Sequence, residues 1–219
     1  NLDGSEGKMC GNGIRCVGKF LYDHGMVDIN EKDEITIETL SGIKKLKAYT
    51  SGGKVNRLRV DMGKAILEPK EIPVVLDGDK VVDRPVEIAG KNYNITCVSM
   101  GNPHCVVFMD DIDNLDIETV GPEFENDKLF PERVNTEFVT VLDDHTIKMR
   151  VWERGSGETW ACGTGACAVA VAACENGFCK KGEDIKIKLK GGDLIINYTD
   201  ETVYMTGNAE KVFEGEVEV

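Results

Sequence analysis

The sequence predicts an α+β protein built from two pseudo-symmetric lobes. Two observations lead to this prediction. A cysteine-containing segment occurs twice, with the same order of expected elements after it, and alternating apolar residues predict strands in much of the remaining chain. The two copies stand too far apart for a solenoid, in which repeats follow one another closely. We therefore expect duplicated lobes that face each other.

The first copy reads EGKMCGNGIRCV and the second reads ETWACGTGACAV. In both, a glutamate stands four residues before a cysteine (Cys10 and Cys162), and the pattern C-G-x-G begins at that cysteine. Apolar residues at helical spacing predict a helix after Cys10. The stretch after Cys162 is rich in alanine and valine, so we expect a more deeply buried helix there. Gly25 and Gly177 follow at matching positions, where glycine readily ends a helix in a left-handed conformation.

Strands are expected after both helices, because isoleucines alternate with polar residues at 33–42 and at 183–192. Five further segments with strand character lie between the copies: 55–63, 93–101, 104–110, 136–143 and 145–153. The first copy has only nine residues before its cysteine and no initiator methionine. We expect that an N-terminal piece of the first lobe is missing; the alternative is a naturally small first lobe.

Composition excludes several classes of partner. The chain has 219 residues, of which 41% are hydrophobic and 30% charged, as in ordinary globular proteins with a buried core. With 39 acidic against 26 basic side chains, its formal charge is −13, which argues against binding to nucleic acid or to an anionic membrane. The longest apolar run, at 166–174, is too short to span a bilayer. The polar N-terminus is unlike a signal peptide, so we expect a cytoplasmic protein.

The eight cysteines allow three interpretations. Four disulfides would suit a small secreted protein, but a chain of this length has no need of them. A zinc site usually contains pairs such as C-x2-C, and the sequence has none. We expect a reduced protein without a metal, in which most cysteines are small buried apolar side chains. These are Cys16, Cys97, Cys105, Cys167, Cys174 and Cys179.

Cys10 and Cys162 stand where acid/base chemistry is expected. A cysteine just before a helix lies near unpaired backbone N–H groups and the positive end of the helix dipole, which lowers the pKa of a thiol. The glycines that follow leave room for a ligand, whose carboxylate can bind the same N–H groups. Two facing thiols suit inversion of the carbon next to a carboxylate, because one group removes a proton while the other delivers one. No phosphate-binding glycine loop is present, so no cofactor is expected.

Four motifs make the chain resemble the diaminopimelate epimerase family over its whole length: NLDGSEGKMCGNGIRC, SMGNPHCV, FPERVNTEF and ERGSGETWACGTGAC. The segment YMTGNAEKVFEGEV resembles the C-terminal end of that family. The resemblance implies an isomerase of lysine and cell-wall precursor biosynthesis, which converts LL-2,6-diaminopimelate to the meso form without pyridoxal phosphate. It implies a small-molecule partner, and family members are often homodimers. It also implies lobes in which a mostly antiparallel sheet wraps around a central helix. We expect the first lobe at 1–62 plus 208–219 and the second at 63–207.

The resemblance also assigns residue roles. Cys10 and Cys162 would be the two acid/base residues, and His104 and Glu153 would lie beside the thiols and influence which one is ionised. The backbone N–H groups of Gly11, Asn12, Gly163 and Thr164 would hold the α-carboxylate. Further substrate contacts, mainly to the distal amino-acid centre, would come from Asn1, Asn102, Asn135, Glu153 and Arg154. Arginine suits a carboxylate because its planar fork makes two parallel bonds. Asn102 and Asn135 could also stabilise turns.

Three other interpretations stay open. Proline and hydroxyproline racemases also have paired cysteines, but in motifs such as M-C-G-H-G and D-R-S-P-C-G-T-G; here Asn12 stands in the place of the histidine. A cysteine hydrolase would use Cys162 with His104, and it would leave the first C-G-N-G unexplained. An inert fragment would lack a cooperative melting transition. If Cys10 and Cys162 share one ligand, we also expect them to form a disulfide on oxidation when no substrate separates them.

Overall fold

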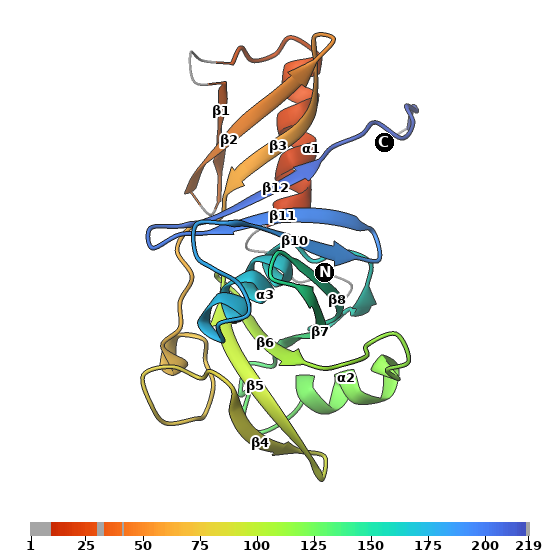
Figure 1. The fold of residues 1–219 in the computed structure, drawn as a ribbon. Coiled ribbons are helices and arrows are strands. Elements are labelled where there is room, and N and C mark those ends of the chain that lie inside the picture. Colours follow the sequence, from red (N-terminus) through yellow and green to blue (C-terminus); the bar gives the residue numbers. More distant parts are fainter. Residues whose placement is uncertain (1–9, 30–32, 41, 218–219) are drawn as a thin grey trace.

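The computed structural model describes residues 10–29, 33–40 and 42–217. Its mixture of helices and strands confirms the predicted α+β class (Figure 1). The elements, in chain order, are α1 (Gly11–Asp23), β1 (Glu34–Thr39), β2 (Gly42–Ser51), β3 (Lys54–Asp61), the short 3-10 helix η1 (Pro69–Glu71), β4 (Arg84–Ile88), β5 (Lys91–Ser99), β6 (Pro103–Phe108), α2 (Ile117–Glu125), β7 (Asn135–Asp143), β8 (Thr146–Glu153), β9 (Gly157–Thr159), α3 (Gly163–Glu175), β10 (Asp184–Leu189), β11 (Gly192–Tyr198) and β12 (Val203–Asn208).

The strands of the described residues form one twelve-stranded sheet. Its order is β1-β2-β3-β12-β11-β10-β8-β7-β6-β5-β4, and β9 pairs with β8 beside this path. Neighbouring strands are antiparallel, except that β6 is parallel to β7 and β8 is parallel to β10. Strand β12 pairs with β3 on one side and with β11 on the other, so the sheet continues from the first copy of the repeat into the second (Figure 1).

Both copies of the repeat form the same elements. α1 and α3 each span 13 residues, and each is followed by an antiparallel hairpin, β1–β2 or β10–β11. Gly25 (φ +65°) and Gly177 (φ +79°) have the left-handed conformation that their positions predict. The five strand segments predicted between the copies are confirmed as β3, β5, β6, β7 and β8.

The two repeated helices differ in their surroundings, as their composition predicts. Every residue of α3 from Gly163 to Ala173 is buried. The helix contacts β5, β6, β7, β10, β11 and β12, so the sheet wraps around it. By contrast, α1 lies on β2, β3 and β12 and leaves part of its surface open, where Val17 is 44% and Phe20 52% exposed. The described residues contain no helix that is both long and apolar enough to cross a membrane.

A second, smaller core lies between α2 and strands β4 to β7 and is separate from the core around α1 and α3. The sequence analysis did not predict α2, because Gly121 and Pro122 stand in the middle of it and both disfavour helices. The structure explains the glycine: a Cβ atom on Gly121 would lie 2.3 Å from the ring of Trp152. The lobe boundaries stay a prediction. The boundary predicted between residues 207 and 208 falls inside β12.

Candidate active site

Cys10 and Cys162 are the N-cap residues of α1 and α3, as the repeated motif predicts. Both backbones are extended, with φ −123° and ψ 95° at Cys10 and φ −120° and ψ 109° at Cys162. The backbone N–H of Gly13 donates a hydrogen bond to Cys10 Sγ at 3.2 Å, and that of Gly165 donates to Cys162 Sγ at 3.3 Å. The two C-G-x-G turns therefore build the same geometry around their sulfur atoms.

The N-terminal ends of the two helices meet at Met205, a fully buried side chain of β12. A Cβ atom on Gly11 would lie 2.5 Å from Met205 Cε, and one on Gly163 would lie 3.1 Å from Met205 Sδ. The side chain of Asn12 reaches the same place, since its Oδ1 lies 3.6 Å from a Cβ atom built on Gly163. The two turns thus lie next to each other, as expected for facing lobes.

The meeting point of the helices offers groups for an amino-acid ligand. The first N–H groups of a helix have no intrahelical partner, and no hydrogen bond between described residues uses the N–H of Gly11, Asn12, Gly163 or Thr164. Two positive helix ends suit a carboxylate. Asn12 Oδ1 is buried and has no partner among the described residues, so it could accept a hydrogen bond from an ammonium group.

Arg15 brings a buried positive charge to the same place, which the sequence analysis did not predict. Its Nη1 donates to the carbonyl oxygen of Gly11 at 3.2 Å and lies 3.7 Å from Met205 Sδ, and its Nε donates to the carbonyl oxygen of Asn208 at 3.4 Å. Burial lowers the pKa of Arg15, and neighbouring thiols, that of Cys10 among them, oppose this shift. Arg15 therefore fastens α1 to β12 near the first cysteine.

A chain of polar side chains leads to Cys162 from the other side. His104 Nδ1 lies 2.7 Å from Glu137 Oε1, and His104 Nε2 lies 3.1 Å from Asn102 Oδ1. Asn102 Nδ2 donates to Thr164 Oγ1 at 3.3 Å, and this hydroxyl lies 3.6 Å from Cys162 Sγ. His104 and Glu137 are fully buried. The structure thus brings the predicted His104, Asn102 and Thr164 together beside the second cysteine.

Glu137 is a second residue of the site, besides Arg15, that was not predicted from the sequence. It lies on β7, and a Cβ atom on Gly165 would lie 2.5 Å from its Oε1 and 3.1 Å from Cys162 Sγ. The signal was present in the segment predicted as a strand: Glu137 and the predicted contact Asn135 are two residues apart, so they share one face of β7. A charged residue within a buried strand is itself unusual.

The pKa of the Cys162 thiol is raised well above its ordinary value, mainly by burial. The charge of Glu153 raises it further, whereas hydrogen bonds from Thr164 and from the N–H of Gly165 lower it. The N–H at the helix end therefore lowers the pKa of Cys162, as its position predicts, but burial and the charge of Glu153 outweigh this effect. Loss of solvation outweighs the helix end, because this sulfur is almost fully enclosed.

Asn135 and Arg154 lie together, but the amide of Asn135 is engaged with the backbone. Its Nδ2 donates to the carbonyl oxygen of Pro103 at 3.0 Å, and its Oδ1 accepts from the N–H of Arg154 at 2.9 Å. The Arg154 guanidinium donates from Nη1 to the carbonyl oxygen of Glu132 at 2.8 Å. Asn135 thereby fixes the segment that carries Arg154, which agrees with the turn role considered for it.

The remaining predicted residues are Glu153 and Asn1. Glu153 ends β8 and accepts a hydrogen bond from the hydroxyl of Thr159, while its charge acts on Cys162. Asn1 lies outside the described residues. Glu158, the repeated glutamate before the second cysteine, pairs with Arg150 at 2.8 Å and Lys190 at 3.0 Å. It therefore stabilises the turn before Cys162.

Disulfides, a metal site and a cysteine hydrolase have less support among the described residues. All eight cysteines are free thiols there, and no group of three or more His, Cys, Asp or Glu side chains in this part of the chain could hold a metal ion. A hydrolase would need His104 to take the proton of Cys162. Both ring nitrogens of His104 instead have other partners, Glu137 and Asn102.

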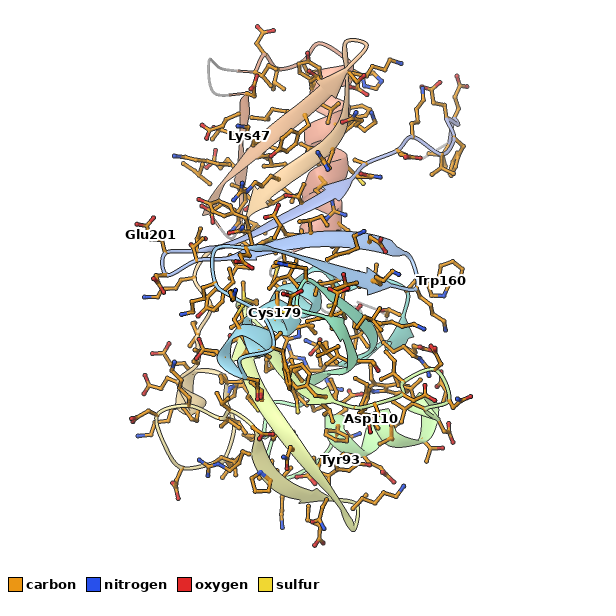
Figure 2. The ribbon with its side chains drawn as sticks, viewed as in Figure 1. Lys47, Tyr93, Asp110, Trp160, Cys179 and Glu201 are labelled. Carbon is orange, nitrogen blue, oxygen red and sulfur yellow. The ribbon has the colours of Figure 1, made fainter. Side chains whose placement is uncertain are left out.

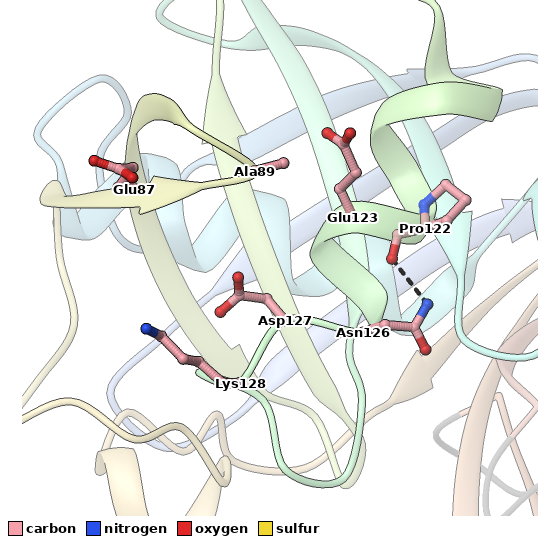
Figure 3. A pocket seen from close by; sticks show the side chains of 7 residues that line it. All are labelled: Glu87, Ala89, Pro122, Glu123, Asn126, Asp127 and Lys128. Atoms are coloured by element: carbon pink, nitrogen blue, oxygen red, sulfur yellow. Dashed lines mark hydrogen bonds between the residues drawn. The ribbon is translucent and has the colours of Figure 1, made fainter.

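Two features of the described surface contain none of the predicted site residues. An open hollow of about 490 Å³ lies between the β4–β5 turn and the end of α2 (Figure 3). It is lined by Glu87, Ala89, Pro122, Glu123, Asn126, Asp127 and Lys128. Trp160 stands two residues before Cys162, is 72% exposed, and points away from the molecule (Figure 2).

The chain is similar in sequence to diaminopimelate epimerases and similar in fold to a probable proline racemase. The family model described as "Diaminopimelate epimerase" matches residues 1–68 and 96–212. A diaminopimelate epimerase from Agathobacter rectalis is 52% identical, with 100% of this chain and 78% of the relative covered. One from Acetivibrio thermocellus is 53% identical, with 100% and 77% covered. Among solved structures, a probable proline racemase from Agrobacterium radiobacter K84 superposes with a TM-score of 0.69 at 17% identity. The match covers 90% of this chain and 64% of that one, less than two thirds of its length, and shows a shared fold.

Proposed function

Since the chain belongs to the diaminopimelate epimerase family, we propose that it converts LL-2,6-diaminopimelate to the meso form. The observation that carries this proposal is the pair of cysteine-capped helices whose N-terminal ends meet at Met205. One thiol on each side of a bound α-carbon is the arrangement that inversion of that carbon needs. Identity of 52–53% to relatives with this name supports the choice of substrate.

In the proposed reaction, Cys10 and Cys162 are the two catalytic residues. The thiolate of one removes the α-proton, and the thiol of the other delivers a proton to the opposite face of the same carbon. One proton leaves the carbon and one arrives, so the sulfur that began as a thiolate ends as a thiol. The reverse reaction exchanges the two roles. Both steps use only protein side chains, which is why we propose a mechanism independent of pyridoxal phosphate.

The α-carboxylate of the substrate would bind the free N–H groups of Gly11, Asn12, Gly163 and Thr164. Two helix ends then act on one anion and stabilise the negative charge that develops next to it when the proton leaves. Asn12 Oδ1, buried without a partner among the described residues, suits the α-ammonium group. A bound substrate would also separate the site from water, which strengthens these interactions.

The distal amino-acid centre would contact Asn1, Asn102, Asn135, Glu153 and Arg154. The Arg154 guanidinium is suited to the distal carboxylate, and its backbone is fixed through Asn135. His104 and Glu153 would act on the thiol beside them rather than on the substrate carbon. Their proximity to Cys162 supports this role, through the Asn102–Thr164 chain for His104 and through charge for Glu153.

Two coarser expectations accompany the proposal. We infer a cytoplasmic enzyme, and the free state of all eight cysteines agrees with a reducing compartment. We also propose that residues 1–62 and 208–219 act as one lobe and residues 63–207 as the other.

The test is exchange of the α-proton with solvent. LL-diaminopimelate is incubated in D2O with reductant and the wild-type chain, and deuterium at the α-carbon is followed by NMR. The expected result is uptake together with formation of the meso isomer. Cys10→Ser and Cys162→Ser should each abolish inversion, because each removes the acid or base from one face. Inversion by either single variant would contradict the two-thiol mechanism, and no exchange by a folded wild-type chain would contradict the substrate assignment.

A further inference from the structure

Glu137 has no role in the mechanism proposed above, yet it is the most enclosed carboxyl group beside the catalytic sulfur. Its side chain is fully buried, and its Oε2 has no hydrogen-bond partner among the described residues. The titratable groups that act on it or on its neighbours come from several elements. They are Cys97 on β5, His104 and Cys105 on β6, Glu153 on β8, and Cys162 at the start of α3.

The direction of the hydrogen bonds can be followed outward from His104. An amide oxygen only accepts, so the contact between His104 Nε2 and Asn102 Oδ1 requires hydrogen on Nε2. Asn102 Nδ2 then donates to the oxygen of Thr164. That oxygen accepts from Asn102, so its own hydrogen is available for Cys162 Sγ, 3.6 Å away; when this sulfur is a thiolate it can only accept, and the hydroxyl of Thr164 is then the donor. Every donor in this chain therefore points toward Cys162.

The short contact between Glu137 Oε1 and His104 Nδ1, 2.7 Å long, must contain one further hydrogen. If it were on Nδ1, the pair would be a carboxylate and an imidazolium, both fully buried. Burying two charges is costly, and a carboxylate oxygen without a donor, as Oε2 is here, adds to that cost. If the hydrogen is on Oε1, both groups are neutral. Burial raises the pKa of Glu137 and the charge of Glu153 adds to this, whereas His104 and, to a smaller extent, the backbone N–H of Glu137 itself oppose it.

We propose that Glu137 is a positioning residue of this site: its neutral carboxyl donates to His104 Nδ1, holds His104 in the tautomer with hydrogen on Nε2, and thereby directs the hydroxyl of Thr164 to Cys162. The hydrogen of Glu137 stays in its bond to Nδ1 and is not transferred during turnover. The effect on catalysis rests on the proposed function, but the tautomer of His104 does not.

The opposite tautomer shows what Glu137 prevents. With hydrogen on Nδ1 instead, Nε2 would need a donor, and the amide of Asn102 would turn over to supply one. Its oxygen would then face Thr164, whose hydroxyl would donate to the amide rather than to Cys162 Sγ. The sulfur would lose one of the two hydrogen bonds that oppose the effect of burial. A lost donor makes the thiolate harder to form.

The first experiment determines the tautomer of His104 by NMR and needs no substrate. The chain has three histidines, so 15N-labelled histidine gives few signals, and a His104→Gln variant identifies those of His104. The expected result at neutral pH is hydrogen on Nε2 and none on Nδ1, in the wild type and in Glu137→Gln, whose amide N–H can also donate to Nδ1. Glu137→Met removes this donor and should release the other tautomer. Hydrogen on both nitrogens of the wild type would mean an ion pair and would overturn the proposal, and so would hydrogen on Nδ1 alone.

The second experiment measures how kcat and its pH profile change when Glu137 is replaced. We expect kcat of Glu137→Gln within about threefold of wild type. Glu137→Met should lower kcat by about 10–100-fold, as lost orienting partners often do, and should move the basic limb of the pH profile to higher pH. Thr164→Val removes the last donor of the chain, so adding Glu137→Met to it should cost less than about threefold more. Two results would refute the proposed series of hydrogen bonds from Glu137 to Cys162. One is a loss of kcat in Glu137→Gln as large as that in Glu137→Met, and the other is a loss in the double variant equal to the product of the two single losses. If Glu137→Met does not fold, the Glu137→Gln comparison and the NMR result still decide.

Discussion

The helix after Cys10 and the helix after Cys162 have the same length, the same cap and the same glycines at their first and third positions, yet they lie in opposite surroundings. Cys10 is exposed and Cys162 is buried. α1 rests on one side of the sheet, whereas α3 is enclosed by it. A short motif therefore determines the local geometry of each thiol, whereas the pKa of the thiol depends on residues far away in the sequence. Around Cys162 those residues are Glu137 and Glu153.

The largest effect expected is complete inactivation by oxidation, which would show the two halves acting as one site. Because the capped helix ends meet at Met205, we expect Cys10 and Cys162 to form a disulfide in the absence of substrate and reductant. Activity should then be lost together with two free thiols, and reductant should restore both.

Cys16→Ala serves as the control, because Cys16 is also an exposed thiol of α1 but has no expected role in the disulfide. It should oxidise like the wild type, whereas Cys10→Ser should keep all its remaining thiols. An unchanged thiol count after prolonged exposure to air would show that the two sulfurs do not meet.

The second glycines of the two motifs, Gly13 and Gly165, form a closely matched pair. A Cβ atom on Gly165 would lie 2.5 Å from Glu137 Oε1, whereas one on Gly13 would meet, among the described residues, only the side chain of Cys10, with Sγ at 3.0 Å. We expect Gly165→Ala to lower the free energy of unfolding by about 1–3 kcal/mol through overpacking and to disturb the His104 chain. For Gly13→Ala, better helix propensity offsets much of the strain, so its change should stay below about 1 kcal/mol. Urea unfolding measures both, and equal losses would contradict the asymmetry.

Val17 and Val169 occupy equivalent positions in α1 and α3 but are 44% and 0% exposed. Truncation to alanine should therefore cost about 2 kcal/mol of unfolding free energy at Val169, where a cavity forms, and about 0.5 kcal/mol at Val17. Thermal unfolding of the two variants checks this. A similar loss at both positions would show that α1 is as enclosed as α3 in solution.

The smallest effect concerns alkaline pH. Burial raises the pKa of Cys167 on α3 to about 12, partly opposed by Arg15. Below about pH 8.5 the thiol is protonated in both the folded and the unfolded state. Between about pH 8.5 and 12 the unfolded chain releases this proton and the folded chain keeps it, so the free energy of unfolding falls as pH rises. At pH 9.5 the loss should be about 1 kcal/mol for this thiol.

Urea unfolding at pH 7.5 and 9.5 measures this loss. Cys167→Ala should reduce the decrease, whereas Cys16→Ala, which removes an exposed thiol of α1, should leave it unchanged. The same decrease in all three proteins would assign the alkaline effect to other groups.

The parts of the fold that the sequence predicts are those with local causes. The caps at Cys10 and Cys162, the left-handed glycines Gly25 and Gly177, and the strands with alternating isoleucines all depend on residues close in the chain. Helix α2 was missed because its cause is not local: its glycine is placed there by the ring of Trp152 on β8.

The candidate site follows the same rule. The sequence indicates which residues carry chemistry, such as His104 and Asn102, but not how they are connected. Their partner Glu137 becomes part of the site only because β6 and β7 are parallel neighbours with His104 opposite Asn135. Likewise, the raised pKa of Cys162 reflects an enclosure that no spacing of residues encodes.

The place of β12 between β3 and β11 has a consequence for the order of assembly during translation. Strand β3 ends at Asp61, but its partner β12 spans Val203–Asn208. Met205, which touches both helix ends, lies on that late strand. On the ribosome, α1 and the β1–β3 segment must therefore wait with one open strand edge until residue 208 has left the exit tunnel. Such an edge invites pairing with other chains. The two cysteine caps can come together at Met205 only after β12 has been made.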